Sequence, residues 1–427
     1  MKVLMSAYSC EPGQGSERGV GWNTAREVAN HHEVWVLTRP DESKEAIEAE
    51  LAANPVPNLH FIYFNLPFIG WLWQLNQSGA MQIHYYLWQI QAYFVARRWH
   101  QQIGFDIAHH VTFVKYSSPC FLAFLPIPLV WGPVGGGESA PEPFWRDFNR
   151  LNRVYEIVRI LWRRIGELDP FTRWTAQRSA IAFATTKDTA QRVQMLGAPS
   201  VQCLSESSLS EADIQQLGQL PPPDVGPVRF ISIARLLHWK GFHLGLQAFA
   251  KANLANSEYW ILGDGPELAR LKQLAQTLGI ADQVKFMGRL PREQVLEKLS
   301  ACSALIHPSL HDSGGWVCLE AMAAGRPVVC LNLGGPAQQV TTKTGIKASA
   351  DSPENAIHEM AIALQTLTTN PDDRVAMGQA GKQRVAELYT LSAKGQFFAN
   401  LYAKVLQSPD FSNLSLPLPW VVPQKAG

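Results

Sequence analysis

Short β-rich runs alternate with helical stretches along most of this chain, and the alternation limits the folds open to it. The runs of the first half are Lys2–Ala7, Glu33–Thr38, Leu59–Phe64, Asp106–Val111, Pro128–Trp131 and Ile181–Thr185. Those of the second half are Val228–Ala234, Glu258–Leu262, Val284–Met287, Ala304–His307 and Pro327–Leu331. Strands that alternate with helices favour parallel sheets covered by helices on both faces. The sequence therefore predicts an α/β protein with two doubly wound, Rossmann-like domains.

The chain has 427 residues, enough for two domains with sizeable cores. A stretch rich in Ser, Pro and Gly, SSLSEADIQQLGQLPPPDVGP, separates the halves and predicts a boundary near Pro221–Pro227. We expect a first domain over 1–220, a second over 221–390, a helix over 391–408 that packs back on the first domain, and a loosely packed tail over 409–427. The two domains would face each other across a cleft, where the carboxyl ends of their strands bind ligands.

Composition and charge exclude several classes of protein. Hydrophobic residues make up 46% and charged residues 17%, as in globular proteins, and a net charge of +1 gives no reason to expect nucleic acid. The six cysteines form no CxxC pair, so we expect free thiols and neither a disulfide framework nor a zinc knuckle. No run of about 18 apolar residues is present, and the N-terminus lacks the features of a signal peptide. We expect a cytoplasmic protein, with a position at the inner face of the membrane left open.

The segment 307–332, HPSLHDSGGWVCLEAMAAGRPVVCLN, carries the most chemistry. Asp312 precedes a Ser-Gly-Gly loop, and Glu320 then opens a predicted helical run that ends at Ala324. Gly325 fits the left-handed cap that ends a helix. A glycine loop before a helix N-terminus offers backbone N–H groups and a positive dipole end to an anion, and two carboxylates can accept hydrogen bonds from sugar hydroxyls. The segment suggests a nucleotide-sugar site; the alternative is a plain turn followed by a dipole-compensating Glu.

Further polar residues of the second half follow predicted strands. Arg235 ends the first of these strands and Lys240 comes five residues later, so the two cations could clamp a diphosphate. The alternative is a pair of solvated surface charges. Gly-Asp-Gly-Pro at 263–266 is by itself a weak signal. Gly288 lies just past a strand end, where the backbone could approach a flat base.

As a set these motifs resemble the C-terminal domain of the retaining glycosyltransferases of family 4, which have the GT-B fold. The resemblance covers most of residues 228–405. It rests on Arg…Lys-Gly at 235–241, Gly-Asp-Gly-Pro at 263–266, Phe-x-Gly at 286–288 and the Glu-Ala-Met-Ala-x-Gly-x-Pro-Val segment that ends at 328.

The resemblance implies a role for each matching position. Arg235 and Lys240 would hold the donor diphosphate, and Glu320 would bind the ribose hydroxyls. Asp312 would contact the transferred sugar; the family usually has the longer Glu there, which leaves the identity of that sugar open. The remaining donor-binding positions would be Gly263, Gly288, Arg289, Gly314, Gly315, Trp316 and Val317.

The first half resembles the family less closely. Gly13, Gly15, Gly19 and Gly21 form a predicted glycine loop after the first strand, and Gly15-Ser16-Glu17 nearly matches the family's Gly-Gly-x-Glu, so Gly15 and Ser16 are candidate donor contacts. The alternative is a plain strand-to-helix turn.

Two further residues of the first half are candidate catalytic residues. Phe105–Val111 resembles the family's Asp-x-x-His strand, which would place His109 at the cleft and His110 in the packed interior. The His that many members have after the next strand is missing here. Glu138 or His109, with the Gly135–Gly137 amides, is the candidate replacement.

No Asp-x-Asp occurs in the chain. The metal-chelating transferases of the other main fold normally need that motif. Arg235, Lys240 and the helix dipole could neutralise the leaving group instead. We predict no metal ion and no cofactor.

Segment 144–165 shows apolar residues at helical spacing (144, 148, 151, 155, 158, 162 and 165), and residues 145–178 hold eight Arg against four acids. A basic amphipathic helix here could contact an anionic membrane, with 144–178 as the contact region; the alternative is a core-facing stripe with solvated arginines. The aromatic residues Trp71, Trp73, Tyr85, Tyr86, Trp88 and Tyr93 could form part of a core or an apolar acceptor groove.

Together, the residues above and the family that they resemble imply a retaining glycosyltransferase. It would move a sugar from a nucleotide-diphosphate donor, UDP favoured, to a hydroxyl of a lipid-linked or oligosaccharide acceptor in exopolysaccharide or cell-envelope glycan synthesis. Two alternatives stay open: a nucleotide-sugar isomerase of the same fold, similar to the 2-epimerases, and a non-catalytic GT-B scaffold that binds a partner.

Overall fold

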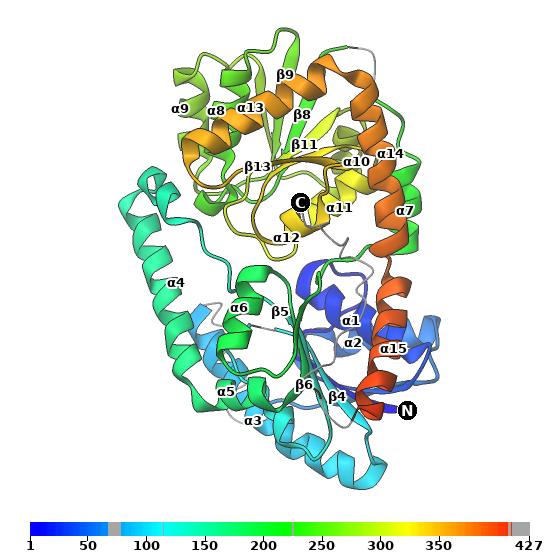
Figure 1. The fold of residues 1–427 in the computed structure, drawn as a ribbon. Coiled ribbons are helices and arrows are strands. Elements are labelled where there is room, and N and C mark those ends of the chain that lie inside the picture. Colours follow the sequence, from blue (N-terminus) through cyan, green and yellow to red (C-terminus); the bar gives the residue numbers. More distant parts are fainter. Residues whose placement is uncertain (67–77, 114, 224–225, 409–410, 412–427) are drawn as a thin grey trace. The chain divides into compact units, whose positions relative to one another are not determined.

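The computed structural model describes residues 1–66, 78–113, 115–223, 226–408 and 411 (Figure 1). These residues form two compact units, each built on its own parallel sheet. The first unit contains Met1–Gly137, Arg159–Glu206 and the described residues from Leu391 onward, and the second contains Glu138–Val158 and Ser207–Thr390.

The first unit has a seven-stranded sheet in the order β3-β2-β1-β4-β5-β6-β7. Its strands are β1 Lys2–Ala7, β2 Glu33–Thr38, β3 Leu59–Tyr63, β4 Ile107–Thr112, β5 Leu129–Val134, β6 Ser179–Ala184 and β7 Val201–Cys203. Its helices are α1 Ser16–Ala29, α2 Pro40–Ala53, α3 Ser78–Ile103, α5 Pro170–Arg178, α6 Lys187–Met195 and α15 Leu391–Gln407, with the 3₁₀ turn η2 at Phe121–Phe124. Helix α4, Arg150–Leu168, begins in the second unit and ends in the first.

Both faces of the first sheet are covered. On one face, Leu4 and Leu37 pack with Tyr85 and Trp88 of α3 in a single apolar cluster. On the other, α1 packs against α15, and Gly395 of α15 allows the close approach because an added Cβ would lie 2.6 Å from Glu27 Cβ. The described part of the chain thus includes the expected C-terminal helix in the first unit.

The second unit has a six-stranded parallel sheet in the order β10-β9-β8-β11-β12-β13. Its strands are β8 Val228–Ile233, β9 Ser257–Leu262, β10 Val284–Gly288, β11 Ala304–His307, β12 Val328–Leu331 and β13 Gly345–Ala348. Its helices are α7 Glu211–Gly218, α8 Phe242–Ala252, α9 Leu268–Thr277, α10 Arg292–Ser300, α11 Trp316–Ala323, α12 Gly334–Gln339, α13 Pro353–Thr369 and α14 Pro371–Leu388, with 3₁₀ turns η3 at Glu142–Asp147 and η4 at His238–Lys240.

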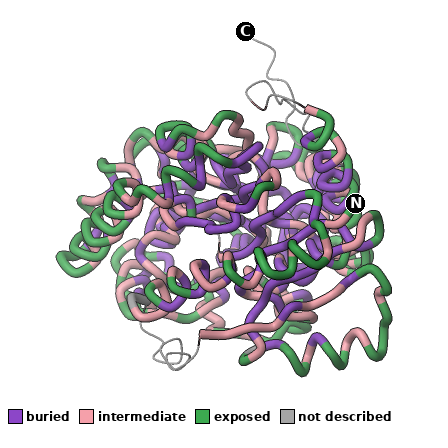
Figure 2. The backbone as a smooth tube through the Cα atoms, turned by 90° about the horizontal axis from the view of Figure 1, so that it is seen from below, coloured by how far each residue is buried: buried purple, intermediate pink, exposed green. Residues whose placement is uncertain are grey.

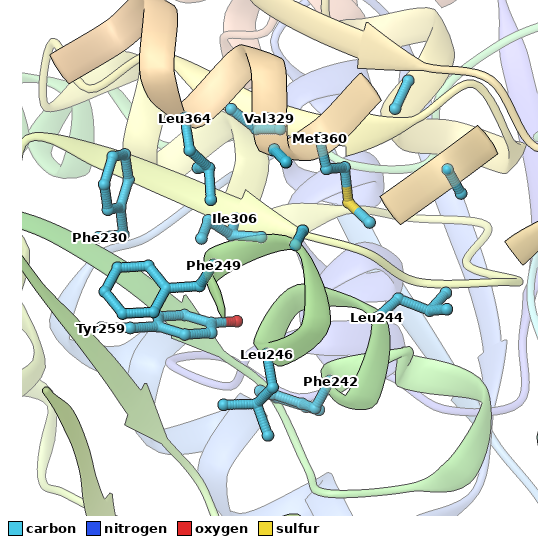
Figure 3. Close-up of a cluster of buried hydrophobic side chains, with 14 of the residues drawn as sticks. Phe230, Phe242, Leu244, Leu246, Phe249, Tyr259, Ile306, Val329, Met360 and Leu364 are labelled. Carbon is cyan, nitrogen blue, oxygen red and sulfur yellow. The ribbon is translucent and has the colours of Figure 1, made fainter. Parts of the chain in front are cut away.

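Two apolar clusters sandwich this second sheet. One joins Phe230 and Tyr259 of the strands to Phe249 of α8 and Met360 of α13, as Figure 3 shows. The other lies under α7, α10, α11 and α14. Figure 2 colours the chain by burial, with buried residues in purple concentrated in the interior and exposed residues in green at the surface. Each unit therefore has the layered architecture that the alternating pattern predicts.

The division of the chain differs from the sequence expectation in two respects. Leu209 and Leu217 are buried in the core of the second unit, and Ser210 caps α7, so the supposed linker contains a packed helix. The second unit therefore starts at Ser207 rather than near 221, and it also includes Glu138–Val158, because Phe144 and Phe148 belong to its core.

The first glycine loop is shorter than predicted. Helix α1 begins at Ser16, so Gly19 and Gly21 lie inside it. A Cβ on Gly21 would lie 2.3 Å from the Ser9 carbonyl oxygen, and one on Gly19 would lie 2.1 Å from that of Gln14. These glycines therefore permit close packing of the helix against the loop before it, and only Gly13 and Gly15 belong to the loop itself.

Candidate functional site

The strongest cluster of functional groups lies where the strand order of the second sheet reverses. Strand β8 pairs with β9 on one side and with β11 on the other, both in parallel. In doubly wound sheets, ligands bind outside the carboxyl ends of the strands at this switch point. Lys240 follows β8 and Asp312 follows β11, and Lys240 Nζ donates to Asp312 Oδ2 at 2.6 Å. The fold thus brings together two predicted site residues that are far apart in the sequence.

Asp312 is held from three directions. Besides Lys240, its Oδ2 lies 3.1 Å from His307 Nε2, and its Oδ1 accepts from the Gly315 backbone N–H at 3.2 Å. Burial opposes the charged carboxylate, but the His307 hydrogen bond and the Lys240 charge outweigh it and hold the pKa of Asp312 well below its usual range. Asp312 is therefore a fixed anion at physiological pH.

Glycines allow the loops around Asp312 to touch through their backbones. Gly241 has φ of +67°, and an added Cβ would lie 1.9 Å from the Pro308 carbonyl oxygen. On the other side, a Cβ on Gly334 would lie 2.4 Å from the Asp312 carbonyl oxygen, and the Gly335 N–H donates to that oxygen at 2.8 Å. The loop before α11 is therefore fixed between two neighbouring loops, which sets the position of its backbone amides.

Helix α11 begins earlier than the sequence suggested. Gly315 precedes it with φ of +63°, and the helix runs from Trp316, so Glu320 lies in its second turn rather than at its start. The sequence prediction placed the start of the helix at its acidic residue, Glu320. The residues from Trp316 to Leu319 are apolar and carry no N-terminal signal, so the true start was missed. Gly325, with φ of +72°, ends the helix as predicted. The amides of Trp316 and Val317 have no partner within the helix and can meet an anion.

Glu320 has a cation beside it. Arg292 of α10 donates to Glu320 Oε1, and the Glu320 side chain is 19% exposed. Burial raises the pKa of Glu320 above its usual value, and the Arg292 charge opposes that shift. A ribose hydroxyl that bound Glu320 would share the carboxylate with Arg292 or replace it.

Arg235 and Arg289 are both exposed, and neither side chain has a hydrogen-bond or ion-pair partner in the part of the chain that the structure describes. Gly263 allows two backbone segments to come close together, because an added Cβ would lie 1.9 Å from the Ala234 carbonyl oxygen. The loop that carries Arg235 therefore contacts the loop after β9. Gly288, with φ of +69°, has open space around its Cβ position and leaves room for a ligand.

Sequence reasoning missed a second layer behind this site. His307 was quoted in the motif but given no role, although it binds Asp312. Glu156 of α4, fully buried, has its Oε1 3.0 Å from His238 Nε2 and 3.4 Å from His311 Nε2. These contacts tie the start of α4 to the loops after β8 and β11.

Trp239 completes this layer. Its ring stacks on Tyr155 of α4, with centroids 5.3 Å apart, and on His311, with centroids 5.2 Å apart. The stack places an aromatic wall beside the residue that precedes Asp312. The Trp next to Lys240 could have drawn attention to an aromatic contact at the site. Its partner Tyr155 is remote in the sequence, so the stack itself could not be predicted.

The structure argues against a place for His109 at an open cleft. His109 is fully buried, and its two ring nitrogens lie 2.6 Å from Tyr402 Oη of α15 and 2.7 Å from the Gly132 carbonyl oxygen. Burial lowers its pKa to about 4. The expected helix over 391–408 does pack on the first unit, but the sequence pattern does not show which strand it covers. His110, expected in the interior, is buried beside Tyr85, whose Oη lies 2.9 Å from His110 Nε2.

The other first-half candidates lie in loops. Gly15 is the residue before α1, and Ser16 is its first residue. The Gly137 N–H donates to Thr189 Oγ1 at 3.0 Å, and Arg163 donates to the carbonyl oxygens of Gly136 and Gly137. Glu138 is buried and belongs to the second unit. Protein groups therefore engage the glycine run through its carbonyl oxygens and through the Gly137 amide, which was one of the amides proposed to replace the missing His.

The aromatic residues upstream divide between two settings. Tyr85 and Trp88 are core residues, whereas Tyr86 and Tyr93 are partly buried. Trp71 and Trp73 lie outside the described residues, as does the tail from 412 onward. Among the described residues no group of three or more His, Cys, Asp or Glu is arranged to hold a metal ion. No described helix is both long and apolar enough to cross a bilayer.

Comparisons with known proteins agree with this architecture. Residues 219–384 match the family model described as glycosyl transferases group 1. A curated relative, the 2-deoxystreptamine glucosyltransferase of Streptomyces kanamyceticus, is 26% identical over 257 residues, which cover 59% of this chain and 64% of the relative. The match thus spans less than two thirds of that relative.

Solved structures resemble the chain over nearly its full length. The lipopolysaccharide outer core galactosyltransferase WaaB in its apo form has a TM-score of 0.63 and 15% identity, and the match covers 95% of this chain and 100% of WaaB. HepE of Anabaena, solved with UDP and glucose, has a TM-score of 0.56 and 18% identity, with coverage of 95% and 100%. The fold is therefore GT-B, with two Rossmann-like units.

Proposed function

Because residues 219–384 match the group 1 glycosyltransferase family on a GT-B fold, we propose that this chain is a retaining glycosyltransferase. It takes a sugar from a nucleotide-diphosphate donor, UDP favoured, and transfers it to a hydroxyl of a lipid-linked or oligosaccharide acceptor. HepE, solved with UDP and glucose, and WaaB, a lipopolysaccharide galactosyltransferase, support the donor and acceptor classes as chemistry that this fold accommodates.

One observation carries the proposal: the Lys240–Asp312 pair at the switch point of the second sheet, directly before the amides that open α11. A cation and helix amides suit a diphosphate. A carboxylate that stays ionised suits the hydroxyls of a sugar. Arg235, exposed after the same strand as Lys240, is available to bind the second phosphate. The set matches the two ends of a nucleotide-sugar.

The transfer step follows from these charges. The bond between the anomeric carbon and the β-phosphate oxygen breaks, and its electron pair stays on the diphosphate, where Arg235, Lys240 and the α11 amides stabilise the developing charge. The acceptor oxygen forms the new bond on the same face of the sugar. Its proton passes to the departing phosphate oxygen, so the step consumes no other reactant.

Turnover of two variants tests the diphosphate role. Arg235→Ala and Lys240→Ala should each lower the rate at saturating donor by about 30-fold to 1000-fold, since each removes a contact worth about 2–4 kcal/mol in the transition state. Lys251→Ala, at the exposed end of α8, is the matched control and should transfer at the normal rate. Near-normal turnover in both site variants would contradict the role.

Release of nucleoside diphosphate separates this function from its rivals. A transferase releases UDP much faster when an acceptor is present, an isomerase interconverts the sugar without acceptor, and a binding scaffold does neither. A panel of nucleotides scored by thermal stabilisation identifies the base first. We also propose that transfer needs no metal, so activity should persist in EDTA. Complete loss, restored by Mn²⁺ or Mg²⁺, would overturn that part.

A further inference from the structure

Helix α4 exposes an apolar face along its whole length. The exposed fractions of its large apolar side chains run from 45% at Val158 to 80% at Leu151. The face consists of Leu151, Val154, Tyr155, Ile157, Val158, Leu161, Trp162, Ile165 and Leu168. Their spacing of three and four residues puts them on one side of the helix. The predicted stripe is therefore real, but from Leu151 onward it does not face a core; Phe144 and Phe148, which precede α4, do.

The opposite face of α4 is polar and packs on the protein. Glu156 is fully buried against His238, and Arg163, 6% exposed, donates to the carbonyl oxygens of Gly136 and Gly137. A Cβ on Gly166 would lie 2.1 Å from the Ser117 carbonyl oxygen. A surface helix of a globular protein normally turns its apolar side inward. Here the polarity is reversed, so the apolar face is available to a partner.

The exposed charge around this face is positive. Arg150, Arg153 and Arg164 of α4 are exposed. Arg173 and Arg178 of α5 are also exposed, beside Trp174, which is 44% exposed. The acidic residues of 145–178 are less exposed than these arginines. Glu156 is buried, and Asp147, Glu167 and Asp169 are half-buried. A partner for this surface should therefore be anionic as well as apolar.

We propose that α4 docks this chain on an anionic lipid surface, with the helix in the plane of the bilayer, its apolar face in the acyl boundary and its arginines among the headgroups. Helices that lie in a membrane interface combine an apolar face with a basic border in this way, and Trp and Tyr favour the headgroup level. A second copy of the chain fits less well, because a pair of α4 faces would bring the arginines of both copies together.

Binding of the full-length protein to vesicles tests this docking. Vesicles of phosphatidylcholine with about one third phosphatidylglycerol should retain the protein in a flotation assay, and pure phosphatidylcholine should retain much less. Leu161→Ser, Trp162→Ser and Ile165→Ser together should lower partitioning about tenfold or more. Met195→Ser and Val375→Ser, exposed on α6 and α14, are the matched apolar controls and should bind normally.

A second pair of variants addresses charge. Arg150→Gln with Arg164→Gln should weaken binding to anionic vesicles several-fold, whereas Arg97→Gln with Arg98→Gln, exposed on α3, should not. Hydrogen exchange of 150–168 should slow when vesicles are added. These measurements do not depend on catalysis. Their failure would therefore contradict the docking proposal and leave the proposed transferase activity unaffected.

Two outcomes would overturn the docking proposal. Equal partitioning of the triple variant and the unchanged protein would remove the apolar face from the interaction. A dimer in sedimentation that the triple variant dissociates without lipid, together with no vesicle binding, would assign the face to a second copy of the chain.

Discussion

At the scale of single residues, two ion pairs occupy the resting site. Lys240 is bound to Asp312 and Glu320 to Arg292, whereas Arg235 has no side-chain partner among the described residues. A diphosphate would compete with Asp312 for Lys240, and a ribose would compete with Arg292 for Glu320. The two acids should therefore respond differently when they are removed.

Truncation of the two acids separates nucleotide binding from transfer. Glu320→Ala should weaken binding of free UDP by about 1–3 kcal/mol, because a buried hydroxyl loses its acceptor. Asp312→Ala should leave UDP affinity unchanged or slightly tighter, because Lys240 is then free for the diphosphate, and should still lower transfer sharply. Calorimetry with UDP and a transfer assay measure the two effects; an equal loss of UDP affinity in both variants would contradict the assignment.

His109, one of the buried histidines of the first unit, should make stability depend on pH. Burial lowers the pKa of His109 to about 4 from its usual 6.5, so below about pH 6.5 the unfolded chain takes up a proton that the folded chain refuses. Its contribution to stability is therefore full above this range and falls as the pH drops toward 4. Between about pH 7 and about pH 5 this residue alone should cost about 2 kcal/mol.

Denaturant unfolding of the first unit at both pH values measures that loss. His109→Gln should lower the slope of the unfolding free energy against pH by the amount expected for the uptake of about one proton on unfolding. His358→Gln, on the exposed side of α13, is the matched control and should leave the dependence unchanged. A His109→Gln profile parallel to that of the unchanged protein would show that the pKa of His109 is the same in the folded and unfolded states.

At the scale of elements, a close contact at one glycine holds two loops of the site together. Gly241, before α8, touches the Pro308 carbonyl through its missing side chain, and this contact holds the loops after β8 and β11 together. Gly279, at the end of α9, has almost the same φ of +70° but open space around its Cβ position. A comparison of Gly241 and Gly279 therefore separates the cost of a positive φ from the cost of losing the loop contact.

Alanine at these two positions should therefore have unequal effects. Gly279→Ala should cost about 1 kcal/mol, the strain of a left-handed residue alone. Gly241→Ala adds a clash with Pro308 and should destabilise the second unit further, with a loss of nucleotide affinity that Gly279→Ala does not share. Thermal unfolding with and without UDP checks both, and equal shifts would mean that the loop contact can relax.

The strands also show what a sequence pattern reveals. Every strand that the alternating runs predicted is present, most within one or two residues, because a central parallel strand is a continuous apolar run. Strands β7 and β13 were missed. Each is an edge strand of three or four residues, and Val201–Cys203 and Gly345–Ala348 are too short to show a pattern.

At the scale of the whole molecule, α15 belongs to the first unit although it comes last in the sequence. Phe398 is 1% exposed, and its ring centroid lies 4.7 Å from that of His109. Phe398→Ala should cost the first unit about 3–5 kcal/mol. Hydrogen exchange should speed up in β1 and β4 and stay unchanged in β8 and β11. Leu406→Ala, 41% exposed on the same helix, is the control; an equal loss of protection in both sheets would show one cooperative unit.

The candidate site was readable from the sequence only where its residues sit in local motifs. Arg235, Lys240, Asp312 and Glu320 follow strands or lie on the helix after them, so the order of elements and the family resemblance were enough to propose them as site residues. The layer behind them was not readable, since Glu156 reaches His311 across a long sequence separation. The burial of His109 depends on α15 in the same way. Contacts between remote segments leave no periodic signal.

The strand order of the second sheet also bears on how the site comes into being during synthesis. Strand β8 can pair with β9 as soon as both have left the ribosome, but its other edge waits until β10 and α10 have been made and β11 follows. Until then that edge presents unpaired backbone groups that could recruit other chains. The ion pair between Lys240 and Asp312 forms only when β11 closes this edge. The binding site therefore forms only after the second edge of β8 has been paired, and its presence reports that this edge is closed.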